Sequence, residues 1–600
     1  MKKLLVKYPV ELLVGLCLLL FFTTRPVDTQ WNRVIFSDGL GYYAHLPAVF
    51  IYQDLEFEFY HDIKAKYLEQ TERQQHTFVN YFKEETVNKY FSGAALLWLP
   101  FFLLAHLLSW LFGFEPDGYS LLYQYGIGLA GVFYLWLGSK AVYRMLQRFS
   151  DNPWHIAAAL TLTILGTNLF FYAVYSGSMT HVYSFALIAW FLELAFRFND
   201  SHNKRWLYGA ALCFGLIVIT RPSNGIVLFT LPFIAGSWAN LKQLFATTFQ
   251  RVHYWTVGLG IIGLLLFMQS LLWYLESGHW YVYTYAEEGF DFARLKWLQS
   301  LFSYRKGWFV YTPLALVAII GLEVAFRKNK FQGWALAGFL LFMVYIISSW
   351  QVWWYGGGFG LRAYVDFYAL IAVLLLFTIQ WISVHGKARI VFGIGVTGML
   401  LLNLVQTYQY QIYILPYDDI NKEIYWSNFL RLQRRAQVRL DHKDVVSIKQ
   451  VENDLETEME GWGNKHTFST EKAHSGVRSS KMQRKSPYGV IYKTRIGSNI
   501  TTANGKIAVA SNVWTDQEES KIVLTMSLVS EGIAYHKRSF SLSEFTIQGG
   551  WTPVEFAMDL KKLRSPEDSL VTYYWIANEK EKAFVDDVRV SFISMKEEEF

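Results

Sequence analysis

A series of long apolar stretches fills the N-terminal two-thirds of the chain, and this feature limits the fold more than any other. Each stretch has roughly 17 to 22 residues, enough for an α-helix to cross a hydrocarbon layer of about 30 Å. Hydrophobic residues make up 53% of the 600 residues and charged residues only 17%, which is too apolar for a soluble protein of this size. The series ends near residue 406. The sequence therefore predicts an α-helical polytopic membrane protein with a different C-terminal region.

The distribution of Lys and Arg predicts the orientation of the helices. The N-terminus is basic and has no small-residue cleavage site, so we expect residues 10–22 to form a first span that starts in the cytoplasm. If residues 93–112 also span, the later basic loops fall outside; if they form a re-entrant or interfacial helix, these loops fall inside. Pro100 and His106 are typical of a broken or shallow helix. The positive-inside rule favours about eleven spans, whereas twelve would leave the C-terminal region in the cytoplasm.

The domain boundaries follow from this orientation. Residues 1–410 are expected to form the membrane domain, in which 24–118 make the first outer loop with interfacial or re-entrant helices. Residues 411–445 are a linker. From residue 446 to 600, short alternating segments separated by polar turns predict an antiparallel β-sandwich. This places the protein in the cytoplasmic membrane, with its sandwich on the periplasmic or extracytoplasmic side.

The C-terminal region resembles the jelly-roll domains of the carbohydrate-binding-module type. The resemblance is carried by Ala473-His474-Ser475-Gly476 and by the segment 584–590. Trp514, Trp551 and Trp575 either supply a stacking platform or fill the core. Carbohydrate binding and a purely structural role both stay open, because many such sandwiches are structural.

The first outer loop contains a candidate general base. Asp38 follows the first span in a glycine-containing turn, with Tyr42 and Tyr43 one helical turn later. A partly desolvated carboxylate there can accept a proton from an incoming hydroxyl group. The alternative is that Asp38 caps the helix that follows it.

Cationic residues gather at the outer ends of the predicted helices. Lys89 precedes the 93–112 stretch, at the depth of lipid phosphates, where it either binds a phosphate or snorkels. The others are Arg221, Arg305, Lys306 and Arg362. A surplus of outer cations opposes the positive-inside rule and indicates a pocket for a phosphate-bearing substrate.

Two further outer motifs are candidates for substrate binding. His181 opens a span, where it is either a site residue or an interfacial side chain. Trp354 precedes Gly356-Gly357-Gly358, and these glycines would let the backbone approach a ligand closely. The sequence has no cluster of His, Cys and carboxylates at metal-ligand spacing, so it indicates no metal or other cofactor, although a divalent metal is compatible with the motifs. It also has no nucleotide-binding motif, and a net charge of +6 over this length does not indicate nucleic acid.

In order along the chain, these motifs resemble the GT-C superfamily of membrane glycosyltransferases, which includes protein mannosyltransferases and aminoarabinose transferases. The resemblance covers residues 1–410. It rests on Asp38, Lys89-Tyr90, Thr180-His181-Val182-Tyr183-Ser184-Phe185, Arg221-Pro222-Ser223-Asn224, Tyr304-Arg305-Lys306-Gly307-Trp308 and Trp354-Tyr355-Gly356-Gly357 with Phe359-Gly360-Leu361-Arg362.

The resemblance implies transfer of a sugar from a polyprenyl-phosphate carrier to a glycan, lipid or protein acceptor, with inversion at the anomeric carbon. Asp38 matches the general base of such enzymes, and Lys89 matches a lysine near the lipid phosphate. We assign Arg305, Lys306 and Arg362 to the donor phosphate. Many members carry a second acid in the first outer loop, whereas Gly39 follows Asp38 here, which leaves a metal-assisted variant in doubt.

Two other functions stay open. A non-catalytic transporter or flippase for a lipid-linked saccharide would share the cationic pocket without needing Asp38 as a base. An assembly protein that acts through its C-terminal sandwich would leave the polar outer motifs unexplained.

Overall fold

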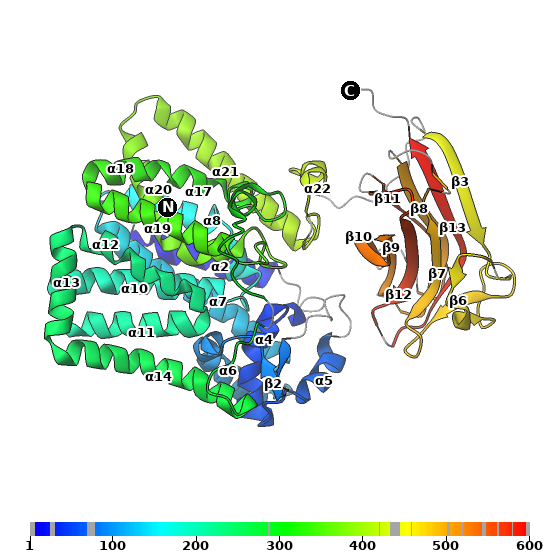
Figure 1. Ribbon diagram of the computed structural model, residues 1–600, viewed down its shortest axis with the longest axis horizontal. Helices are drawn as coiled ribbons and strands as arrows, with labels where there is room; N and C mark the ends of the chain where they lie inside the picture. The colour runs from blue at the N-terminus through cyan, green and yellow to red at the C-terminus, as the bar shows by residue number, and fades with distance from the viewer. Residues whose placement is uncertain are drawn as a thin grey trace. The chain divides into compact units, whose positions relative to one another are not determined.

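The computed structural model forms two compact units (Figure 1), and each is described here by itself. Unit 1 comprises Met1–His61 and His76–Arg434, and unit 2 comprises Asp62–Gln75 and Arg435–Phe600. The structure describes residues 7–24, 31–68, 78–83, 85–285, 288–418, 420–432, 445–457, 459–497, 499–500, 505–517, 520–542, 546, 548–560, 563–578 and 580–595.

Unit 1 is helical, and among the described residues seven of its helices are long and apolar enough to cross a membrane. These are α6 (Gly93–Phe112), α7 (Leu121–Gln147), α10 (His181–Ser201), α14 (Val252–Ser277), α19 (Lys330–Ser348), η5 with α20 (Arg362–Ser383) and α21 (Ala388–Gln411). Three shorter helices are also apolar, namely α2 (Pro9–Thr23), α8 (Pro153–Leu165) and η4 with α12 (Pro222–Ala235).

The structure does not confirm the expected number of about eleven spans, because several apolar stretches are not single helices. Pro313 separates α16 (Trp308–Tyr311) from α17 (Pro313–Ala318), and α18 (Ile320–Lys328) follows. A proline cannot donate a backbone hydrogen bond, so it begins a helix more readily than it continues one. Other helices of unit 1 are η1 (Trp31–Arg33), α4 (Asp38–Pro47), η2 (Ala48–Tyr52), α9 (Leu169–Val174), α11 (Lys204–Thr220), α13 (Trp238–Gln250), α15 (Trp297–Phe302) and α22 (Lys422–Asn428), and α5 (Phe59–Ile63) begins in unit 1.

Helix α6 covers the stretch whose position the sequence left open. It is one helix of 20 residues, so the break at Pro100 is absent. Its Leu97 carbonyl accepts a hydrogen bond from Tyr134 of α7 at 3.2 Å, and the Trp98 ring lies 5.4 Å from the ring of Tyr183, near the start of α10. His106, further along α6, also contacts α7 through the Tyr123 hydroxyl at 2.5 Å, so α6 packs along α7 and beside the start of α10. Its non-spanning position stays a prediction.

A short hairpin lies just before α6 and ends next to the candidate site. Strand β1 (Val79–Phe82) pairs antiparallel with β2 (Glu85–Asn88). The Asn88 side chain donates to the carbonyl of Gly41 in α4 at 2.8 Å. A side chain at Gly41 would collide with the Tyr90 ring at 2.2 Å, so glycine allows the segment after β2 to pack directly on α4.

Unit 2 contains two antiparallel sheets, which confirms the predicted all-β domain. The five-stranded sheet has the order β10 (Ile533–Ser541), β9 (Ile522–Ser530), β12 (Ser569–Ile576), β7 (Tyr488–Arg495) and β4 (Trp462–Gly463). The second sheet has the order β11 (Trp551–Asp559), β8 (Gly505–Thr515), β13 (Ala583–Met595), β6 (Ser479–Met482) and β5 (Phe468–Ser469), and β3 (Val445–Asn453) also pairs with β13.

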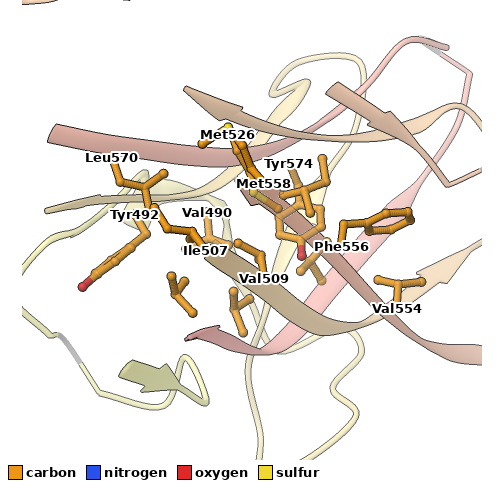
Figure 2. Packing of buried hydrophobic residues seen from close by; sticks show 14 of the residues in the cluster. Val490, Tyr492, Ile507, Val509, Met526, Val554, Phe556, Met558, Leu570 and Tyr574 are labelled. Atoms are coloured by element: carbon orange, nitrogen blue, oxygen red, sulfur yellow. The ribbon is translucent and has the colours of Figure 1, made fainter. Parts of the chain in front are cut away.

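Alternating side chains of both sheets form the core of unit 2 (Figure 2). Leu570 and Tyr574 of β12 enter it from one sheet, and Ile507 and Val509 of β8 enter it from the other.

The three tryptophans considered as a platform do not form one row. Trp514 and Trp551 are cross-strand partners in the six-stranded sheet, whereas Trp575 belongs to β12 of the other sheet. All three are partly exposed rather than fully buried.

Candidate functional site

A cavity of about 650 Å³ lies within unit 1 and brings together five of the predicted site residues. Helix α4, the segment after β2, the ends of α11 and α14, the loop 281–290 and the loop 350–362 line it. Its polar side chains include Asp38, Tyr42, Lys89, Arg221, Glu288 and Arg362. Phe91, Val218, Leu266, Trp273 and Val282 line an apolar part. The cavity can therefore hold a molecule with an anionic and an apolar part.

Asp38 and Arg362 form an ion pair at this cavity. Asp38 is the first residue of α4, where the positive end of the helix dipole favours a carboxylate. Arg362 is the first residue of η5 (Arg362–Phe367) and lies 324 residues away along the chain. Its terminal Nη2 donates to Asp38 Oδ2 at 2.5 Å. The candidate base and a candidate phosphate ligand are thus in direct contact.

The glycine-rich loop before Arg362 shapes the cavity in a way that the sequence did not predict. A Cβ on Gly357 would lie 1.6 Å from the Tyr417 ring, and one on Gly358 would lie 2.7 Å from the Tyr172 hydroxyl. These two glycines are therefore needed for contact with tyrosines of the protein, whereas the expectation was close approach to a ligand. Gly356 does line the cavity, and its φ of +68° favours glycine there.

Arg221 is held at the cavity by a buried carboxylate. Its Nε lies 3.3 Å from Oδ2 of Asp366, which is fully buried. Asn224 donates to the same oxygen at 2.7 Å, and His181 Nδ1 lies 2.8 Å from Oδ1. His181 therefore fixes Asp366 in place and lies behind the cavity wall.

Lys89 forms an ion pair with a carboxylate that also lines the cavity. Its Nζ lies 2.6 Å from Oε1 of Glu288 and 5.3 Å from the centre of the Tyr285 ring. The Thr284 hydroxyl donates to the carbonyl of Lys89 at 2.7 Å, which ties the 281–290 loop to the segment after β2. Lys89, Thr284 and Glu288 therefore line the same part of the cavity wall.

Tyr42 and Tyr43 are neighbours in α4 but point to different surroundings. The Tyr42 ring lies 4.5 Å from the Tyr90 ring, and both line the cavity. Burial raises the pKa of Tyr42, so its phenol stays protonated at neutral pH and can only donate or accept a hydrogen bond. The Tyr43 hydroxyl instead donates to the carbonyl of Gly118, away from the cavity lining.

Arg305, Lys306 and Trp354 form a second cluster, which is not part of the cavity lining. Arg305 makes a two-pronged ion pair with Asp418, at 2.9 and 2.8 Å, and its guanidinium lies 3.9 Å from the centre of the Trp354 ring. The buried ammonium of Lys306 donates to the carbonyls of Gly358 and Tyr417, at 2.5 and 2.9 Å. These cations hold the segment around residue 417 against the glycine-rich loop.

Sequence reasoning missed two carboxylates of the site, Asp366 and Glu288. Asp366 lies four residues after Arg362 at the start of an apolar stretch, and an acid in that position is itself a signal of function. Glu288 lies between α14 and α15, in a segment without a distinctive pattern. Neither ion pair was predictable from the sequence, because the partners are far apart along the chain. Asp366 and Arg221 are separated by 145 residues, and Glu288 and Lys89 by 199.

Within the part of the chain that the structure describes, no three His, Cys, Asp or Glu side chains are grouped so that they could hold a metal ion.

Comparison with known proteins gives little further information. No protein-family model and no curated protein matches the chain. One solved structure that it resembles is the CBM22-1 xylan-binding domain of Xyn10C from Paenibacillus barcinonensis. The sequence identity is 12%, the match covers 24% of this chain and 95% of that chain, and the TM-score is 0.20.

Proposed function

We propose that unit 1 is a membrane glycosyltransferase that moves a sugar from a polyprenyl-phosphate-linked donor to a glycan, lipid or protein acceptor. The observation that carries the proposal is the composition of the cavity: the carboxylate of Asp38, the cations Lys89, Arg221 and Arg362, and an apolar part in one space. A polyprenyl-phosphate sugar has the matching parts, which are a phosphate, a sugar and an apolar chain.

In the proposed reaction, an oxygen of the acceptor hydroxyl attacks the anomeric carbon of the donor sugar. The proton of that hydroxyl moves to the carboxylate of Asp38. The bond between the anomeric carbon and the phosphate oxygen breaks, and its electron pair stays on the phosphate. The leaving group gains negative charge, so cations beside it stabilise the transition state without a general acid. Attack opposite to the leaving group inverts the anomeric configuration.

The proposal includes a position in the cell. About eleven spans, with the basic loops in the cytoplasm, would put the cavity and unit 2 on the outer face of the cytoplasmic membrane. The contacts of Glu11 and Lys140 support this arrangement, because they link the basic end of α7 to the start of α2. We propose no metal or organic cofactor for the reaction.

The substitution Asp38→Asn tests the proposed base. Cells that lack the protein should accumulate a polyprenyl-phosphate-linked sugar, which mass spectrometry of their lipids would detect. Wild-type protein should remove this lipid, and Asp38→Asn should not, because loss of a general base costs about 100- to 10,000-fold in rate. Asp54→Asn is a matched control: Asp54 accepts from the backbone N–H groups of Glu56 and Phe59 outside the cavity, and Asn keeps one of these two hydrogen bonds. Full restoration by Asp38→Asn would refute the role of Asp38.

The same experiment separates the enzyme from its main alternative, a transporter or flippase for a lipid-linked saccharide. A transporter would need the cationic cavity but no base. It would therefore lose function in a variant that lacks Arg362 and keep it in Asp38→Asn.

A further inference from the structure

Arg362 has an incomplete set of hydrogen bonds for a buried cation. Its side chain carries five N–H donors, and the residue is only 9% exposed. One terminal nitrogen donates to Asp38, the other donates to the sulfur of Met179 at 3.3 Å, and Nε has no hydrogen-bond partner. A thioether sulfur is a weak acceptor. Because an unsatisfied buried charge is unfavourable, this guanidinium favours any anion that can reach its free N–H groups.

The geometry places this incompletely bonded group on the cavity wall, together with Arg221. Nε of Arg221 also has no hydrogen-bond partner, although Asp366 is near it. Asp366 is fully buried and is also held by His181 and Asn224, so the acid paired with Arg221 lies outside the cavity lining. Asp38 is different, because it lines the cavity itself. Arg362 can therefore release the carboxylate of Asp38 and bind another anion. The released carboxylate would then lie at the cavity and not in the protein interior.

We propose that the phosphate of the donor competes with Asp38 for Arg362, so that Asp38 is released to act as a base only when the donor is bound. This inference rests on the proposed glycosyl transfer and adds an order of events to it, in which donor binding precedes proton transfer to Asp38. A carboxylate held by a guanidinium is a weaker proton acceptor than one released from it. A phosphate can accept two parallel N–H bonds from the guanidinium, and one of these is the Nη2 bond that otherwise goes to Asp38. The enzyme then binds the donor before Asp38 can accept the proton of the acceptor hydroxyl.

A double-mutant cycle on ligand binding tests the exchange without any need for activity. The probe is farnesyl phosphate, with farnesol as the matched ligand that lacks the phosphate, and binding is measured on the full-length protein in detergent. If Asp38 competes for Arg362, Asp38→Asn should tighten farnesyl phosphate binding about tenfold and leave farnesol binding unchanged. In an Arg362→Gln background the same Asp38→Asn substitution should change farnesyl phosphate binding less than about twofold.

The background variant separates exchange at Arg362 from a general effect of charge. If Asp38→Asn strengthens phosphate binding equally with and without Arg362, the carboxylate acts only through its charge, and the exchange is wrong. Should Arg362→Gln not fold, Arg362→Lys replaces it, since it keeps the charge but loses the two-pronged donor geometry. In the Arg362→Lys background, the change in farnesyl phosphate affinity caused by Asp38→Asn should be less than a third of the change in the wild-type background.

The outcomes also separate this inference from the proposed function. If the wild-type protein binds farnesyl phosphate no better than farnesol, the cavity is not a polyprenyl-phosphate site, and both proposals fail. If it prefers farnesyl phosphate but Asp38→Asn leaves the affinity unchanged, the proposed function stands and the exchange at Arg362 is overturned.

Discussion

Two cationic clusters of unit 1 look alike in the sequence and differ in the structure. Lys89, Arg221 and Arg362 line a cavity together with the carboxylate of Asp38, whereas Arg305 and Lys306 lie outside its lining. Lys306 donates hydrogen bonds to backbone carbonyls, and Arg305 forms an ion pair with Asp418. In the sequence, the cations of both clusters lie near glycines and aromatic residues. Cations of both clusters form ion pairs, so the difference teaches that the packing around a cation, which the sequence does not show, decides whether it lines a cavity.

Replacing Arg362 should have the largest effect on the rate of sugar transfer, and it tests the difference between the two clusters. Arg362→Gln removes the cation beside the leaving phosphate, so we expect the rate of sugar transfer to fall about 100- to 1,000-fold. Arg305→Gln, in the other cluster, should change the rate less than about threefold per folded molecule, because its ion pair with Asp418 is only partly buried. Initial rates with membranes that contain equal amounts of each variant would check this. Equal losses for both variants would break the distinction between the clusters.

A second prediction concerns the stability of the cluster outside the cavity. Lys306→Met removes a buried ammonium that donates to two carbonyls, and it leaves those carbonyls without that donor. We expect a loss of about 2 kcal/mol in the free energy of unfolding, seen as a lower thermal unfolding midpoint in detergent. The transfer rate of the folded fraction should stay near that of the wild type. A variant with normal stability and no activity would place Lys306 in the reaction instead.

The smallest expected effect is at Tyr42. Its pKa is raised by burial, so the phenol stays protonated near neutral pH and cannot serve as the proposed base there. Tyr42→Phe should therefore lower the transfer rate about threefold or less through loss of one hydrogen bond. The pH dependence of the rate should keep its shape. A shifted pH profile would show that Tyr42 takes part in proton transfer.

The sequence predicted the two-part architecture because the underlying patterns are local. Apolar stretches of membrane length and alternating segments such as 522–528 and 570–575 each carry their own structural signal, and both alternating segments are strands. The number of spans was less predictable. Hydropathy counts apolar stretches, but it does not register that a residue such as Pro313 divides one stretch into short helices.

The candidate site was predictable only in part, because its residues meet through long-range contacts. Asp38 and Arg362 each stood out as a charge at a helix end, yet nothing in the sequence pairs two residues 324 positions apart. The same limit explains why Asp366 was missed and why His181 looked like a site residue. His181 is conspicuous in the sequence, but its role in the structure is to hold Asp366.

The account is tested most directly by the initial rate of sugar transfer in two matched variants, Asp38→Asn and Asp418→Asn. Each removes the charge of an aspartate that is paired with an arginine, one at the cavity and one outside its lining. We predict a loss of at least about 100-fold for Asp38→Asn and less than about threefold for Asp418→Asn. A fully active Asp38→Asn protein, or equal losses in the two variants, would contradict the assignment of the cavity as the active site.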